Sequence, residues 1–410
     1  MADLFDRFQP LLERRDSLVG DGGCDPFEVK MDKVLSQTEA VIDGRPTILA
    51  GTNNYLGLTF ATESLQAAHN ALEYFGTGTT GSRVANGTYC GHKSLEERLA
   101  KFLNKQSAIV FSTGYLANLS VLSTLVGPDD FILMDADCHA SIYDGVRMGE
   151  AQIIRFKHND ANDLDKRLAR LSKKGGNKLI VVEGIYSMLG DKAPLREIVK
   201  VKKKYDDTYL LSDEAHSLGV LGRFGRGLPE EAGVEKDVDF IVGTFSKSVG
   251  TIGGFCVSDH PKFDLLRLAC RPYIFTASLP PSVVASAQAS LQLLENGGAL
   301  RKRLMRNAEQ LHKGLSDLGL SIGGAVSPVV AVVVPEVSLG VQFWRGLISE
   351  GVYVNLALPP ATPHNYTLLR CSLCAAHTSE QIDQIIESFA SVGLNTGILS
   401  DRNVQKIAVV

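Results

Sequence analysis

The chain has 410 residues, of which 44% are hydrophobic and 21% are charged, as in ordinary globular proteins and unlike disordered or fibrous chains. Its 42 lysines and arginines against 46 aspartates and glutamates leave a net charge of −4, so nothing in the charge balance suggests nucleic-acid binding. The length predicts two or three structural units around a sizeable buried core.

The start of the chain predicts neither a signal peptide nor a membrane span. Residues 1–18 are charged and amphipathic, and no apolar stretch reaches the roughly 18 residues that a span needs. We therefore expect a cytoplasmic protein. The stretch Leu4–Leu12 leaves two alternatives open, a helix that packs within a dimer and a peripheral contact with the inner membrane.

From about residue 60 to residue 260, short apolar runs alternate with helical periodicity, the pattern of βα units in a mostly parallel sheet. The expected strands are Ala108–Ser112, Phe131–Asp135, Gln152–Phe156, Leu179–Glu183, Tyr209–Ser212, Phe240–Gly243 and Gly254–Ser258. The expected helices between them are Leu95–Leu103, Tyr115–Leu125, Ala161–Leu171 and Pro194–Tyr205. Polar residues that follow such strands are site candidates, because open α/β sheets bind ligands beyond the carboxyl ends of their strands.

The last third of the chain predicts a smaller α+β unit. Its expected elements are a long helical segment from Pro281 to about Leu315, a strand Val329–Val334, a helix Val341–Glu350, a strand Thr367–Leu373 and a helix Glu380–Val392. We expect an N-terminal segment (residues 1–55), a large α/β domain that carries the site (56–290) and a small C-terminal α+β domain (291–410).

Residues Gly76–Gly81 satisfy the GxGxxG pattern of a dinucleotide-binding turn, but the context contradicts that function. The fingerprint needs a strand before the first glycine, whereas 65–75 has helical spacing and 82–91 is loop-like. Two alternatives remain: backbone that approaches a ligand or second subunit closely, and an ordinary turn.

The seven cysteines are odd in number and scattered, which predicts reduced, partly buried thiols. Cys371 and Cys374 form a CxxC pair, but no second pair accompanies it and it lies in a β-like run. We therefore expect no metal site.

Lys247 lies just after an expected strand, within Thr244–Gly250, among hydroxyls and small residues and without another charge nearby. Such an environment suits a desolvated nucleophilic amine, although a lysine at a strand end is often only solvated surface. The hydroxyls of Thr244 and Ser246 are candidates for phosphate binding.

Three further segments carry suggestive groups after strands. Asp213 lies at the end of an apolar strand, where it is either a helix cap or the partner of a protonated heterocycle. In the second case His216, three residues later, is placed to hydrogen-bond an oxygen on the same heterocyclic ring. His139 follows another strand, as a loop residue or stacked on an aromatic ring. The strand–turn–helix junction at Ser112–Asn118 offers free N–H groups to an anion. Together these groups fit pyridoxal 5′-phosphate (PLP), whose pyridine nitrogen needs an anionic partner to stay protonated.

The chain resembles the α-oxoamine synthases, PLP enzymes of fold type I, over roughly residues 25 to 395. The segments that carry the resemblance are GTNNYLGL (51–58), GTGTTGSRVANGT (76–88), FSTGYLANL (111–119), DADCHASIYDG (135–145), EGIYSMLGD (183–191), DEAHSLGVLG (213–222), GTFSKSVGTIGGF (243–255), RPYIFTASLPPSV (271–283), PPATP (359–363) and LLRCS (368–372). Their shared order makes the resemblance specific, although each segment alone would be weak.

The resemblance implies the PLP-dependent aminotransferase-like fold, a homodimer with shared active sites, and a role for each matched residue. It implies that Lys247 carries the cofactor covalently, that Asp213 binds the pyridine nitrogen, that His216 binds the ring oxygen, and that His139 stacks on the ring. Other implied cofactor contacts are Gly114, Tyr115, Ser187, Thr244, Ser246 and, toward the neighbouring subunit, Thr276. Implied substrate contacts are Arg370, which suits a carboxylate clamp, and Asn54.

The resemblance is strongest to the branch that uses L-serine, and it implies a decarboxylating Claisen condensation with a long-chain acyl thioester. With a palmitoyl thioester the product is 3-ketodihydrosphingosine, the first sphingolipid base. The sequence leaves open the acyl length and the choice between coenzyme A and acyl carrier protein. One departure bears on amino-acid selectivity: relatives carry arginine directly before PPATP, where this chain has Leu358.

Three alternatives to the serine-using reaction remain. Other members of the family use glycine, to give 2-amino-3-ketobutyrate or 5-aminolevulinate, or alanine, to give 8-amino-7-oxononanoate. A non-catalytic partner subunit is a third alternative, but the presence of Lys247, Asp213, His139 and His216 argues against it.

Overall fold

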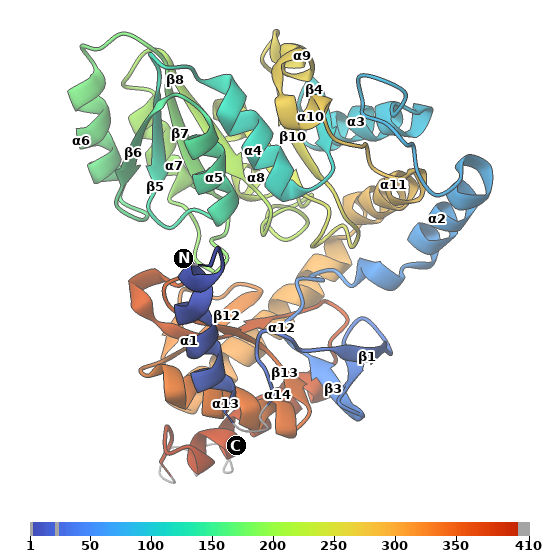
Figure 1. The fold of residues 1–410 in the computed structure, drawn as a ribbon, viewed down its shortest axis with the longest axis vertical. Helices are drawn as coiled ribbons and strands as arrows, with labels where there is room; N and C mark the ends of the chain where they lie inside the picture. Colours follow the sequence, from blue (N-terminus) through green and yellow to red (C-terminus); the bar gives the residue numbers. More distant parts are fainter. Residues whose placement is uncertain (1–2, 21–23, 401–410) are drawn as a thin grey trace. The chain divides into compact units, whose positions relative to one another are not determined.

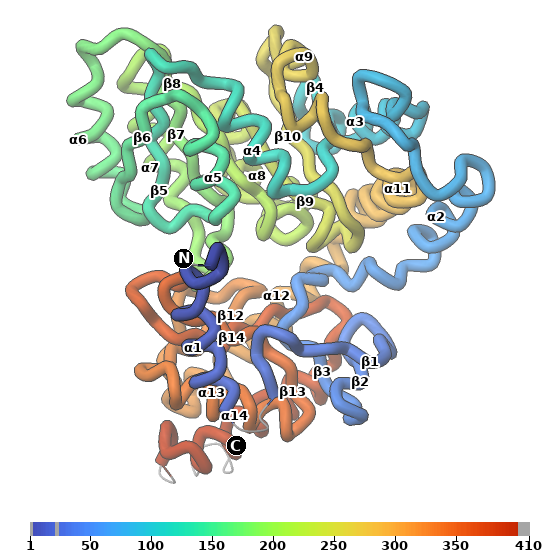
Figure 2. The backbone as a smooth tube through the Cα atoms, viewed as in Figure 1, coloured from blue at the N-terminus to red at the C-terminus, as the bar shows by residue number. Residues whose placement is uncertain are grey.

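A computed structural model of the chain describes residues 3–20 and 24–400. The chain forms two compact units, which we call the terminal unit (residues 1–52, 306–373 and 377–410) and the site unit (53–305 and 374–376). Segments from both ends of the sequence, blue and red in Figure 2, thus belong to one unit. Residues 1–2, 21–23 and 401–410 of the expected terminal segments lie outside the described residues.

The site unit is built on a seven-stranded sheet in the order β4-β10-β9-β8-β7-β5-β6 (Figure 1). Its strands are β4 (Ser107–Phe111), β5 (Phe131–Asp135), β6 (Gln152–Phe156), β7 (Lys178–Glu183), β8 (Thr208–Asp213), β9 (Phe240–Thr244) and β10 (Gly254–Ser258). The strands β5 to β9 pair in parallel, and β10 pairs antiparallel with both β9 and the edge strand β4. The expectation of a mostly parallel sheet is confirmed, since continuous apolar runs such as β5 are buried along their whole length.

Helices connect and cover these strands. They are α2 (Thr62–Phe75), α3 (Cys90–Phe102), α4 (Gly114–Leu125), α5 (Ala140–Met148), α6 (Ala161–Leu171), α7 (Leu195–Lys202), α8 (Leu228–Ala232), α9 (Leu266–Ala269), α10 (Arg271–Ile274) and α11 (Pro281–Glu295). Side chains accept hydrogen bonds at three helix starts: Thr113 caps α4, His139 caps α5 and Asp160 caps α6. Figure 1 shows α4 and α5 side by side against the sheet, where their apolar residues join one core with β5, β7 and β9.

The expectation of one long helix from Pro281 to Leu315 is wrong. Two helices, α11 and α12 (Gly298–Asp317), replace it, because the sequence Asn296-Gly297-Gly298 interrupts the helical backbone. The guanidinium of Arg301 then donates to the carbonyl of Leu294 (2.9 Å) near the end of α11, which also accepts from the backbone N–H of Gly297 (3.0 Å).

The terminal unit contains two small sheets. One has the order β1-β2-β3-β13 and comprises β1 (Met31–Val34), β2 (Glu39–Ile42), β3 (Arg45–Leu49) and β13 (Val352–Tyr353). The other, β11-β12-β15-β14, is antiparallel and comprises β11 (Ile322–Gly323), β12 (Val329–Val334), β14 (Asn355–Ala357) and β15 (Thr367–Ser372). Its helices are α1 (Gln9–Val19), α13 (Val337–Ser349), α14 (Ser379–Asn395) and the later part of α12.

Short 3₁₀ turns complete the chain, namely η1 (Asp6–Phe8), η2 (Leu58–Phe60), η3 (Glu235–Asp237), η4 (Phe263–Leu265) and η5 (Pro363–Asn365). Across residues 3–20 and 24–400, no helix has both the length and the apolar content to cross a bilayer.

The two doubtful motifs have structural explanations. Helix α2 directly precedes Gly76, so the dinucleotide fingerprint lacks its strand as expected, and a Cβ on Gly87 would lie 2.1 Å from the carbonyl oxygen of Gly81. Gly87 is therefore needed for close packing within the loop, whereas a Cβ on Gly76 or Gly78 would meet nothing within 4 Å. Cys371 and Cys374 are buried and not disulfide-bonded, and burial raises the pKa of Cys371 to about 12. Among the described residues no cluster of side chains suits a metal ion.

Candidate active site

A cavity of about 350 Å³ lies in the site unit where β7, β8 and β9 end and α4 and α5 begin. It is lined by residues singled out from the sequence, namely Gly114, Tyr115, His139, Asp213, His216, Thr244, Ser246 and Lys247. The carboxyl ends of parallel strands lie at one edge of the sheet. Here β5 has β6 on one side and β7 on the other, so the strand order reverses at β5, and open α/β sheets bind ligands where the order reverses.

Asp213 is the last residue of β8 and is 5% exposed. Its carboxylate accepts a hydrogen bond from the Asn118 side-chain amide (2.7 Å) and another from the backbone N–H of Ala215 (2.9 Å). Two donors on a buried carboxylate fix its direction, so Asp213 is a fixed acceptor on the cavity wall.

His139 caps α5, which orients its ring. The ring Nδ1 lies 2.8 Å from the Ser141 hydroxyl, and the backbone N–H of His139 donates to Glu183, the last residue of β7. Burial and the positive charge of Lys247 lower the pKa of His139, while Asp213 and Asp144 act in the opposite direction. Burial raises the pKa of Glu183 well above its usual value, and the charge of Asp213 adds to that shift.

His216 is buried next to Tyr55, whose hydroxyl lies 2.6 Å from His216 Nδ1. The two rings meet edge to face, with centroids 6.0 Å apart. Tyr55 therefore holds the imidazole in one orientation at the cavity wall.

The junction of β9 with α4 has the features of a phosphate site. A Cβ on Gly114 would lie 2.7 Å from the Cβ of Thr244, so only glycine lets the helix start lie so close to the strand end. The first turn of a helix presents N–H groups without intrahelical partners, and in α4 these begin at Gly114 and Tyr115. The hydroxyls of Thr244 and Ser246 lie 2.8 Å apart beside them.

Lys247 follows β9 by three residues and is half-buried. Its positive charge acts on the pKa values of both His139 and Glu183, which places the amine among the groups of the cavity wall. A lysine amine in such a cavity is suited to covalent chemistry with a carbonyl compound.

Four residues expected at the site are not part of this cavity wall. Asn54 is buried in the site unit and donates to Thr59 (2.8 Å), and Ser187 is half-buried in the turn between Ile185 and Lys192. Arg370 belongs to the terminal unit, on β15, where its guanidinium donates to Ser372 (2.8 Å). Thr276 lines a much smaller pocket.

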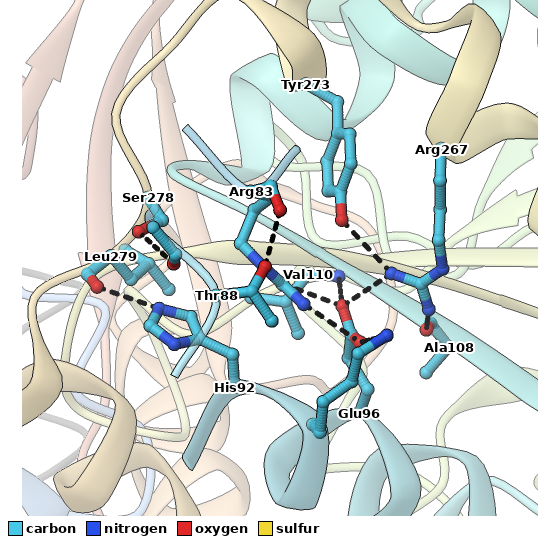
Figure 3. Close-up of polar contacts among 12 residues, drawn as sticks. Arg83, Thr88, His92, Glu96, Ala108, Val110, Arg267, Tyr273, Ser278 and Leu279 are labelled. Atoms are coloured by element: carbon cyan, nitrogen blue, oxygen red, sulfur yellow. Dashed lines mark hydrogen bonds and ion pairs between the residues drawn. The ribbon is translucent and has the colours of Figure 1, made fainter. Parts of the chain in front are cut away.

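The segment that carries Thr276 is fastened by a buried ionic cluster (Figure 3). Glu96 on α3 is 4% exposed and receives two hydrogen bonds from Arg83 (2.8 and 3.1 Å) and one from Arg267 (3.0 Å). Arg267 also donates to Tyr273, and Ser278 Oγ donates to the backbone carbonyl of Gly87 (2.7 Å).

Sequence reasoning missed four residues of this neighbourhood. Glu183 ends its strand just as Asp213 does, and that position is a signal that was available. Asn118, Ser141 and Tyr55 carry no such signal, because their side chains meet the site only through the packing of α4, α5 and the segment near residue 55.

The described side chains fit PLP on their own chemistry. The cavity contains an amine at Lys247, a fixed carboxylate at Asp213 for the pyridine nitrogen, an imidazole at His139 and a helix start with hydroxyls for the phosphate.

Comparison with known proteins supports this chemistry. The profile of the family described as aminotransferase class I and II matches residues 46–389. The chain belongs to this family. A serine palmitoyltransferase of Caulobacter vibrioides is 56% identical over 398 residues, covering 97% of this chain and 98% of that protein.

Solved structures give the same result. The serine palmitoyltransferase of Sphingomonas wittichii superposes with a TM-score of 0.95 at 55% identity, covering 97% of this chain and all of that one. A high-resolution serine palmitoyltransferase structure with PLP also gives 0.95, at 51% identity, with the same coverage of both chains. Within the class I and II aminotransferases, the chain is therefore an α-oxoamine synthase with the PLP-dependent aminotransferase fold.

Proposed function

We propose that the protein is a serine palmitoyltransferase. It condenses L-serine with a long-chain acyl thioester such as palmitoyl-CoA, with loss of CO2 and release of the thiol, to give 3-ketodihydrosphingosine. One observation carries the proposal: a single cavity holds Lys247, Asp213 and His139 in a chain that matches serine palmitoyltransferases over nearly its whole length.

PLP, when bound, supplies an electron sink for the negative charge that develops at the α-carbon of the amino acid. In this proposal Lys247 would hold the cofactor covalently, and its free amine would take the α-proton on Nζ. With the cofactor bound, Asp213 would hold a proton on the pyridine nitrogen, His216 would bind the ring oxygen and His139 would pack on the ring face. Gly114, Tyr115, Thr244 and Ser246 bind the phosphate, with Ser187 and Thr276 as additional contacts.

Two residues are assigned to the amino acid. Arg370 pairs with the substrate carboxylate, since a guanidinium matches a carboxylate with two parallel hydrogen bonds, and Asn54 is an additional polar contact. A new carbon–carbon bond forms between the α-carbon and the acyl carbonyl carbon as the thiolate leaves, the bond to the carboxylate breaks with release of CO2, and a proton returns to the α-carbon in its place.

We further propose a cytoplasmic homodimer in which Thr276 of one subunit serves the site of the other. The exposed side chains of Leu4, Phe5 and Leu11 leave open a peripheral contact with the inner membrane.

A spectral titration of the purified holoenzyme tests the function. Serine, glycine, alanine and threonine are added separately, and the visible absorbance of the cofactor is followed. Each amino acid is then incubated with palmitoyl-CoA, and the amino ketone and released thiol are quantified. We expect a spectral response and turnover with serine. A response to glycine or alanine with none to serine would assign the protein to another α-oxoamine synthase branch, and a colourless protein would favour a non-catalytic subunit.

A further inference from the structure

A chain of hydrogen bonds runs along the cavity wall from Asp213 through Asn118 and Ser141 to His139. The Asn118 Nδ2 atom lies 2.7 Å from Asp213 Oδ2 and 3.0 Å from Ser141 Oγ. Ser141 Oγ in turn lies 2.8 Å from His139 Nδ1, and the backbone N–H of Ser141 also points at that nitrogen, at 3.2 Å. These hydrogen bonds join β8 to the consecutive helices α4 and α5.

Chemistry fixes the direction of each bond. An ionised carboxylate only accepts, so the Asn118 atom that faces Asp213 is the amide nitrogen, and its second N–H is directed at Ser141 Oγ. Because Ser141 Oγ already accepts that hydrogen, its own proton is available to Nδ1 of His139. The backbone N–H of Ser141 has no choice and also donates to Nδ1.

Two donors therefore converge on one ring nitrogen. A nitrogen that accepts hydrogen bonds bears no proton, which leaves the proton of the neutral imidazole on Nε2. We propose that Asn118 and Ser141 are positioning residues that hold the His139 ring neutral, with its proton on Nε2.

Charged groups around His139 act on its pKa in both directions, and the hydrogen bonds from Ser141 add to the effects that favour the neutral ring. Asp213 on β8 and Asp144 on α5 favour a protonated ring, whereas burial and Lys247 disfavour it. Glu183 on β7 accepts from the His139 backbone, and burial raises the pKa of that carboxyl, which weakens its negative charge. The two hydrogen bonds donated to Nδ1 favour the neutral ring, as burial does, because a proton on Nδ1 would point at the N–H of Ser141.

Asn118 also bears a cost that packing alone does not explain. Its Oδ1 atom is buried and has no hydrogen-bond partner among the described residues, a situation that destabilises a fold by about 1–3 kcal/mol. We infer that Asn118 acts through its amide N–H groups, both of which donate hydrogen bonds, one to Asp213 and one to Ser141.

The consequence for catalysis rests on the proposed function. There the ring of His139 packs against a pyridine ring that Asp213 keeps protonated. A neutral imidazole does not place a second positive charge against that ring. The hydrogen bonds through Asn118 and Ser141 connect His139 to Asp213, so the same side chains orient the carboxylate that keeps the pyridine protonated and keep the imidazole neutral.

Nitrogen NMR of ¹⁵N-histidine-labelled protein tests the proposal directly, without turnover. The His139 signals are assigned by their absence in His139→Gln, and the pH is titrated in the cofactor-free and cofactor-bound protein. We expect an unprotonated type of signal for Nδ1 and a protonated type for Nε2. In Ser141→Ala the titration midpoint of His139 should rise by about half to one pH unit, since one donor to the neutral ring is lost.

Companion variants separate this role from a general disturbance. Asn118→Leu should shift the midpoint in the same direction, and Ser141→Thr, which keeps the hydroxyl, should restore the parental value. Ser120→Ala is the matched control. Ser120, on α4, is buried as Ser141 is, but its hydroxyl has no partner in the described part of the chain. A proton on Nδ1 in the parent, or equal midpoints in Ser141→Ala and Ser120→Ala, would overturn the proposal. Failure to turn over serine would instead reject the proposed function and leave these signals unchanged.

Discussion

Lys247 is the residue on which the proposed chemistry depends. We expect Lys247→Ala to abolish turnover, because among the described residues Lys247 alone brings an amine to the cavity lining. Borohydride reduction of the parent holoenzyme followed by peptide mapping should place the cofactor label on the peptide that contains Lys247. Substantial activity in Lys247→Ala, or a label on another lysine, would contradict the assignment.

Glu214 gives a prediction about stability and pH. It is fully buried and accepts from Ser212, Ser217 and the backbone N–H of Leu228, yet burial raises its pKa to about 7. The folded state therefore keeps a proton that the unfolded chain releases from its ordinary pKa upward.

The sign follows from that difference. Between the unfolded pKa of 4.5 and about pH 7 the unfolded state binds fewer protons, so the free energy of unfolding should fall as pH rises, by on the order of 3 kcal/mol in total. Denaturant unfolding at pH 5, 6 and 7.5 measures it, with Glu214→Gln as reference. Parallel pH profiles of parent and variant would refute the prediction.

At the scale of elements, the cluster in Figure 3 ties α3 to the segments around residues 83 and 267–279. In Glu96→Gln the buried Arg83 loses its counter-ion, while the half-buried Arg267 keeps only its ion pair with Asp264 (2.9 Å), and we expect a loss of about 3–5 kcal/mol in unfolding free energy. Denaturant titration measures it. The control is Glu97→Gln, on the same helix but exposed, which should change stability little. Equal stability of the two variants would show that the cluster is not stabilising.

The turn that carries Ser187 has its own support. His158 lies between Asp135 and Asp191, with both contacts at 2.7 Å, and Asp191 accepts from the backbone of Tyr186. Burial alone would lower the pKa of His158, but the hydrogen bonds and charges of the two carboxylates raise it to about 10.

Because the pKa of His158 is higher in the folded state than in the unfolded state, its protonation stabilises the fold fully below pH 6.5, the unfolded pKa. That stabilisation decreases above pH 6.5 and is lost as the pH rises through about 10. We expect the difference in melting temperature between the parent and His158→Gln to shrink steadily from pH 7 to pH 10. His69→Gln, a variant at a largely exposed histidine, should show no such trend. A constant difference for His158→Gln would mean that its charge contributes nothing.

At the scale of the whole molecule, the proposed shared site predicts complementation between subunits. Lys247→Ala and a Thr276→Trp variant should each be inactive as homodimers, the second through blocked cofactor access. When they are mixed and allowed to exchange, some dimers contain one site with both parental residues, and activity should return to about a quarter of the parental value, taking random exchange as an approximation. Light scattering should give the mass of a dimer. A monomer, or a mixture that stays inactive, would contradict the shared site.

The sequence by itself determined the local order of the site unit. A buried parallel strand is a continuous apolar run, as in β5, which coincides with its expected range; β6 and β10 also coincide with theirs, and residues that follow the parallel strands gather at one sheet edge. The break at residues 296–297 was missed because helical periodicity continues on both sides of it. The N-terminal strands β1 to β3 were also missed, since short and partly exposed strands have little apolar signal.

Only the tertiary structure decided which polar groups meet. Asn118 and Ser141 lie within helices, where periodicity predicts a face but not a hydrogen-bond partner on another element. The same holds for Glu96, whose two arginines come from positions 13 residues before it and 171 residues after it. Long-range contacts follow from the order of strands in the sheet and from helix packing, which no short window of sequence contains.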